Sequence, residues 1–157
     1  MGTGEIIGLI VQSGMWAAMI ATLIVYGLQL KSMKKSSEMG SAMRLFEYLQ
    51  DQEVRDARRH VILSLKDKDP TKWTDVDERA ASRTCSTYDI AGVIIRSNTV
   101  PKDVFLDGYG ASVIKCHDIL ASYIKQMQKI NEPMEYWKSF DWLYDRVQIR
   151  HVVFTKQ

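Results

Sequence analysis

Cysteine is scarce in this sequence, which contains only Cys85 and Cys116 among 157 residues. The two residues fall on separate predicted helices, form no CxxC motif and have no further pair with which to build a disulfide framework. Two buried free thiols are therefore the expected state. His60, His117 and His151 are equally dispersed and lie in no HExxH or ExxH pattern, so we expect no metal site and no cofactor.

An excess of one charge is also lacking. The formal net charge is +2, and acidic and basic residues alternate from Arg44 onward. This balance gives no indication of a nucleic-acid partner. Charge is absent altogether from residues 6–30, which read IIGLIVQSGMWAAMIATLIVYGLQL. About 25 residues of helix are ~37 Å long, enough to cross a hydrocarbon core of ~30 Å. The segment predicts a transmembrane helix, preceded by a short tail of residues 1–5.

Basic residues indicate the direction of this span. All 21 Lys and Arg residues lie at or after Lys31, and Lys31, Lys34 and Lys35 follow the apolar stretch directly. By the positive-inside bias, the N-terminus is outside and the C-terminal domain is in the cytoplasm. We therefore expect a single-pass protein of the inner (cytoplasmic) membrane, with the lipid bilayer as its first partner.

One face of the predicted span carries small side chains, which would let another helix approach closely. This face consists of Gly14, Ala17, Ala18, Ala21 and Thr22. It suggests packing against another membrane protein or a second copy of the chain. The alternative is that small residues are simply common in spanning helices.

The rest of the chain predicts an all-α fold, a small antiparallel helical bundle over residues 42–150. A juxtamembrane segment, residues 31–41, is either helix or hinge, with a weak point at Gly40. Met39, Met43 and Phe46 have helical spacing, and a break follows near Asp51.

Two longer helices follow in the predicted domain. Thr74 and Asp77 resemble a capping box that opens a helix running to about Asn98. Its apolar stripe consists of Ala81, Cys85, Tyr88, Ala91 and Ile95. The next helix has the clearest amphipathic pattern, Phe105, Tyr109, Val113, Cys116, Leu120, Tyr123 and Met127. Gly108 and Gly110 suggest a division within it. A last helix follows Pro133, and residues 151–157 are interpreted as a frayed tail.

Three segments carry a family resemblance: LFEYLQDQEVRDARRHV at 45–61, IAGVIIRSNTVPKDVFLDGYGASVIKCHDIL at 90–120, and YWKSFDWLYD at 136–145. They resemble an uncharacterised, mostly bacterial family, domain of unknown function 4760. The resemblance covers the chain from the span to about Arg146. It implies an N-terminal spanning helix followed by a helical domain, and it implies no catalytic residues.

Two groups of side chains are candidate binding sites. Arg55, Arg58, Arg59 and His60 form a basic cluster that would suit a phosphate or an anionic lipid head group. The alternative there is a solvated helix face, with Asp51 and Arg55 at ion-pair spacing. The second group is aromatic and covers more sides of a short helix than one buried face requires. Its possible partner surface consists of Tyr136, Trp137, Trp142 and Tyr144.

Catalysis has little support in the sequence. Cys116 and His117 are adjacent, so on a helix they project about 100° apart and do not face each other. We therefore expect a membrane-anchored, non-enzymatic interaction module or accessory subunit of a membrane complex. The alternative hypothesis is a membrane-tethered sensor or effector in a bacterial stress or defence response, with the Arg55 to His60 cluster as its input site.

Overall fold

The structure is a computed structural model that describes residues 2–154. The side chains of residues 3, 5–11, 13, 17 and 151–154 fall outside this description. All the regular elements in the described part are helical, which confirms the all-α prediction. The chain divides after Glu38 into two units, and each is considered by itself.

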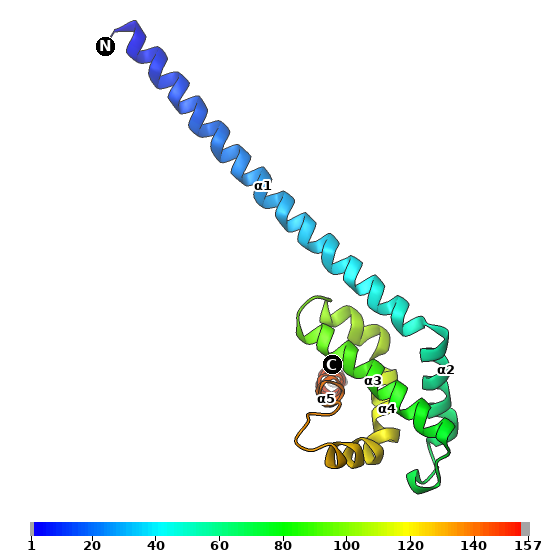
Figure 1. Ribbon diagram of the computed structural model, residues 1–157. Helices are drawn as coiled ribbons and strands as arrows, with labels where there is room; N and C mark the ends of the chain where they lie inside the picture. Colours follow the sequence, from blue (N-terminus) through cyan, green and yellow to red (C-terminus); the bar gives the residue numbers. More distant parts are fainter. Residues whose placement is uncertain (1, 155–157) are drawn as a thin grey trace. The chain divides into compact units, whose positions relative to one another are not determined.

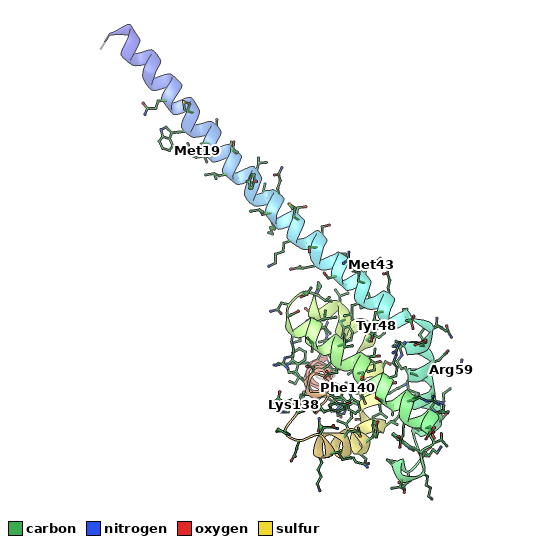
Figure 2. The ribbon with its side chains drawn as sticks, viewed as in Figure 1. Met19, Met43, Tyr48, Arg59, Lys138 and Phe140 are labelled. Carbon is green, nitrogen blue, oxygen red and sulfur yellow. The ribbon has the colours of Figure 1, made fainter. Side chains whose placement is uncertain are left out.

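The first unit consists of the part of α1 (Thr3–Gln50) that extends to Glu38. This helix continues without interruption through residues 31–41. The predicted weak point at Gly40 is therefore helical. Among the described residues, one helix is long and apolar enough to cross a membrane, and its qualifying stretch begins at Gly14. The large apolar side chains described between Met15 and Leu30 are exposed, as Met19 is in Figure 2.

The second unit is a helical bundle built from the end of α1 and four further helices (Figure 1). Its α-helices are α2 (Gln52–His60), α3 (Asp75–Arg96), α4 (Lys102–Ile130) and α5 (Lys138–Phe154). A short π-helix, η1 (Val61–Leu65), continues α2, and a 3-10 turn, η2 (Pro70–Lys72), precedes α3. In the packing, α3 contacts α5 and α2, and α4 contacts α5.

Helix boundaries follow local chemistry. Asp51 ends α1 and begins α2, since its carboxylate accepts a hydrogen bond from the Glu53 N–H at 3.0 Å. This role replaces the predicted Asp51–Arg55 ion pair, which is not among the ion pairs of the described residues. At α3 the capping box of Thr74 and Asp77 is confirmed in both directions.

The core lies where the periodicity of α3 and α4 predicts it. The α3 stripe from Ala81 to Ile95 is buried, and Phe105, Val113, Cys116 and Leu120 of α4 are fully buried. Phe140 of α5 packs among them and lies inside the domain in Figure 2. Its ring centroid is 5.2 Å from that of Tyr88.

Two expectations about the domain are wrong. Gly108 and Gly110 do not divide α4, because the helix is continuous and Gly110 is buried where Val147 of α5 packs against it. The helical spacing of Met39, Met43 and Phe46 is confirmed, and the buried face of the end of α1 consists of Ala42, Leu45 and Leu49. Residues 151–154 continue α5, and the remaining tail residues lie outside the described part.

Candidate functional site

The structure brings three residues of the predicted basic cluster together on α2. Arg55, Arg58 and Arg59 line one depression. Arg55 and Arg59 are exposed, and Figure 2 places Arg59 at the outer edge of the domain. Arg58 is partly buried, and His60 lies apart from the arginines, because α2 packs against α3 and His60 contacts Asp77 there.

Arg58 is a structural residue. Its Nη2 donates a hydrogen bond to the Leu49 carbonyl at 3.3 Å, one of the carbonyls left open at the end of α1. The guanidinium carbon lies 5.6 Å from the centre of the Tyr109 ring, a cation–π distance. Gln50 also donates to the Tyr109 hydroxyl at 2.7 Å. Arg58 thus ties the junction of α1 and α2 to α4.

His60 joins α2 to the start of α3. Its Nε2 lies 2.8 Å from Oδ1 of Asp77, a carboxylate that is buried. Lys68 binds the other oxygen of Asp77, and the Thr74 N–H donates to that oxygen at 2.8 Å. The hydrogen bond from Lys68, followed by those from Thr74 and His60, holds the pKa of Asp77 well below its usual range. This ionised carboxylate fixes the position of the segment that follows η1.

Between these fixed ends, η1 presents Ile62 and Leu63 to the surface, and a depression lies on each side of them. The first has a volume of about 340 Å³ and is lined by Gln52, Arg55, Asp56, Arg58, Arg59, Ile62 and Leu63. The second, of about 510 Å³, is lined by Ile62, Leu63, Lys66, Lys115, Asp118 and Ile119. The two depressions adjoin at Ile62 and Leu63, which line both, and we call the pair the α2–η1 groove.

The charges of the α2–η1 groove are unbalanced. Four exposed cations line it, Arg55, Arg59, Lys66 and Lys115, and none belongs to an ion pair among the residues that the structure describes. The groove contains two carboxylates, fewer than its four exposed cations, and both accept hydrogen bonds from neutral side chains. Asp56 accepts two hydrogen bonds from Gln52, at 3.0 and 2.9 Å, and Asp118 accepts one from the Tyr144 hydroxyl at 2.8 Å. The groove is therefore suited to a negatively charged ligand with apolar groups.

A second pocket, which the sequence did not predict, surrounds a histidine and an aspartate. His117 Nε2 lies 2.8 Å from Oδ1 of Asp141, and Gln128 donates to Oδ2 at 2.8 Å. Burial raises the pKa of Asp141, but these two hydrogen bonds outweigh it, so the pKa lies below its usual value. The pocket has a volume of only about 240 Å³. His117 and Asp141 are 24 residues apart, so no short motif could have identified the pair.

The predicted aromatic partner surface is largely used inside the domain. Trp137 is only 5 % exposed and has a positive φ of 54°, a rare backbone conformation for a bulky residue. It is therefore a core residue and cannot contribute to a partner surface. Tyr136, Trp142 and Tyr144 are partly buried. Tyr144 stacks on His117 with a centroid distance of 4.0 Å, and the Arg96 and Arg146 guanidinium carbons lie 5.5 and 5.6 Å from the Trp142 ring centre.

Both cysteines are free and buried, as predicted. Burial raises the pKa of Cys116 to about 11, which keeps the thiol protonated and unreactive at neutral pH. Cys116 therefore behaves as a small apolar core residue. In the described part of the chain, His, Cys, Asp and Glu side chains nowhere gather in a group of three or more that could hold a metal ion.

The small-residue face of the first unit is open. Gly14, Ala18, Ala21 and Thr22 are exposed, and a Cβ added to Gly14 would meet no atom within 4 Å. The side chain of Ala17 lies outside the described residues. Lys31, Lys34 and Lys35 are exposed, and Lys34 lies 3.9 Å from Glu38.

Comparison with known proteins gives a family match. The sequence profile of a family described as "Domain of unknown function (DUF4760)" matches residues 16–147. Neither the curated proteins nor the solved structures provide a match.

Proposed function

This chain belongs to the DUF4760 family, whose description assigns no activity, and from its residues we propose a membrane-anchored, non-enzymatic interaction module. In this proposal the apolar part of α1 is the anchor, and the helical domain binds a partner within a membrane complex. The proposed location is the inner membrane, with the N-terminus outside and the domain in the cytoplasm.

The exposed apolar surface of α1 carries this proposal. Eight large apolar side chains between Met15 and Leu28 are each at least 52 % exposed: Met15, Trp16, Met19, Ile20, Leu23, Ile24, Val25 and Leu28. They occupy all sides of the helix, so a single packed neighbour would not cover them. A hydrocarbon environment would cover them all, because the helix satisfies its own backbone hydrogen bonds.

The charges that flank this stretch support the proposed orientation. Lys31, Lys34 and Lys35 follow it within one to two turns, and the sequence before it contains no Lys or Arg. The positive-inside bias acts on cations close to the end of a span, so these three lysines favour a cytoplasmic domain. The open small-residue face favours a partner in the membrane, either another membrane protein or a second copy.

A sensor or effector that recognises a ligand through the Arg55 to His60 cluster has less support. His60 contacts the buried Asp77 and Arg58 donates to the Leu49 carbonyl, so Arg55 and Arg59 are the exposed cations of the cluster. An interaction module needs no such cluster. It needs an exposed surface that a partner can cover. The α2–η1 groove provides such a surface, with the exposed Leu63 and four exposed cations.

The anchor can be tested by placing charges in it. An Ile20→Arg/Ile24→Arg variant should leave the membrane fraction, since each arginine near the centre of a span costs roughly 2.5–3.5 kcal/mol. The matched control is Ile90→Arg/Val93→Arg, which changes exposed residues of α3 in the same way and should stay with the membrane. Carbonate extraction followed by immunoblotting gives the distribution. Release of the wild-type protein by carbonate would contradict the proposal.

A further inference from the structure

We infer that the α2–η1 groove binds an acidic amphipathic segment of another protein, an inference that rests on the proposed role as an interaction module. The apolar side chains of this segment would lie on Ile62, Leu63 and Ile119. Its carboxylates would face the four cations Arg55, Arg59, Lys66 and Lys115.

The apolar part of the groove has no cover in the domain. Leu63 is 68 % exposed, although it lies on a short helix between two firmly held ends. Ile62 and Ile119 pack against the core from the outside and keep part of their surface open. The π-helical turn brings Ile62 and Leu63 side by side to the surface, and π-helical turns are frequent at functional sites. A partner that covers these residues gains the free energy of apolar burial.

Charge determines which partner fits. The four cations have no ion-pair partner among the described residues, and they outnumber the two carboxylates of the groove, Asp56 and Asp118. A basic or neutral segment would leave these cations unpaired or would repel them. An acidic segment would pair with them and associate faster through electrostatic attraction.

Shape favours a polypeptide segment over other anions. The two depressions adjoin at Ile62 and Leu63, so an occupant of both must extend across these residues. A single phosphate would fill only part of one depression. A helix or an extended peptide carries successive side chains along its length, so it can cover Leu63 and enter both depressions.

Site-specific photo-crosslinking in cells tests this inference on the full-length protein. A benzoylphenylalanine at position 63 should form adducts with a polypeptide. The same residue at position 93, an exposed position of α3 outside the groove, is the matched control. Mass spectrometry of the adducts from position 63 should identify segments rich in Asp and Glu with apolar residues at helical spacing. Position 93 should not yield these segments.

Charge reversal makes the test specific. Arg55→Glu/Arg59→Glu should reduce the yield of the position 63 adduct at least about tenfold, because like charges would then face each other across the interface. Lys72→Glu/Lys129→Glu reverses two exposed lysines outside the groove and should leave the yield unchanged. Equal melting temperatures would show that both double variants fold. If Arg55→Glu/Arg59→Glu melts lower, the milder Arg55→Gln/Arg59→Gln takes its place, with an expected loss of several fold.

Three results would overturn the inference: adducts with lipid alone, adducts with segments that are not acidic, or a yield that charge reversal does not alter. Carbonate extraction of the same cells separates this failure from failure of the proposed function. If the protein stays in the membrane and the crosslinks fail, only the assignment of the groove is wrong. If the protein leaves the membrane, the anchor proposal is wrong as well.

Discussion

The two units of this chain use the same apolar residue types in opposite ways. In the first unit Leu23, Ile24 and Leu28 are 66 %, 59 % and 64 % exposed. In the second unit Leu49, Leu120 and Ile124 are at most 2 % exposed. Side-chain chemistry is therefore the same, and the difference lies in how the apolar residues are distributed around each helix.

Distribution determines which environment can cover a helix. In α3 and α4 apolar residues recur on one stripe and charged residues occupy the opposite face, so neighbouring helices can bury the stripe. In residues 14–30 of α1 no charged residue interrupts the apolar surface on any side. Such a surface requires an apolar environment all around it. Substitutions that remove apolar contacts should thus affect the two units very differently.

The largest expected effect comes from truncating a core aromatic residue. Phe140→Ala removes a fully buried ring that contacts Tyr88 and His117, and it should lower the free energy of unfolding of the domain by about 3–5 kcal/mol. Leu23→Ala, in the exposed part of α1, should change it by less than about 0.5 kcal/mol. Urea unfolding of the detergent-solubilised protein, followed by tryptophan fluorescence, measures both values. Similar losses would show that the two units are not energetically distinct.

Glycines give a second, smaller contrast. A Cβ on Gly92 would lie 2.3 Å from the Ser139 carbonyl oxygen, so Gly92→Ala should push α3 and α5 apart and destabilise the domain by about 1–3 kcal/mol. At Gly108 a Cβ would meet no atom within 4 Å. Gly108→Ala should therefore stabilise α4 by about 0.5–1 kcal/mol, the difference in helix propensity. Thermal unfolding by circular dichroism would record shifts of opposite sign. A stabilising Gly92→Ala would mean that the two helices are not closely packed.

The smallest expected effect concerns the buried carboxylate of Asp77. Because its pKa is lowered in the folded state, its contribution to stability is complete above the unfolded pKa of about 4 and is lost as the pH falls toward the folded value. Asp77→Asn should lower the melting temperature by roughly 3–6 °C at pH 7. The difference from wild type should shrink as the pH falls below about 4.

Asp75→Asn is the matched control for this prediction. Asp75 is in the same first turn of α3 but is exposed. Its substitution should leave the melting temperature nearly unchanged at both pH values. A pH-independent effect of Asp77→Asn would show that the Asp77 charge is not what stabilises the turn.

Patterns in the sequence predicted the structural features that depend on residues close together in the chain. The capping box at Thr74 and Asp77 and the α3 stripe are confirmed, because both depend on contacts within three or four residues along one helix. The helical spacing of Met39, Met43 and Phe46 did not identify which face of α1 is buried. Two apolar faces compete in that segment, and only the packing against the remaining helices selects Ala42, Leu45 and Leu49.

The candidate site depended on contacts between distant residues. From the sequence, Arg58 resembles any surface cation. Its structural role depends on contacts with Leu49 and Tyr109, which are 9 and 51 residues away in sequence. The groove likewise combines η1 with Lys115, Asp118 and Ile119 of α4. No spacing rule joins these segments, so the sequence predicted the arginines of the groove and missed Lys66, Lys115 and its apolar part.

The burial of Cys85 and Cys116 makes the native chain a ready background for chemical labelling. Both thiols are fully enclosed, and a raised pKa keeps Cys116 in the unreactive protonated form. A maleimide dye added under native conditions would thus attach to a single engineered surface cysteine before it reacted with either natural one. Slow modification of the natural thiols would in turn report how often the bundle opens.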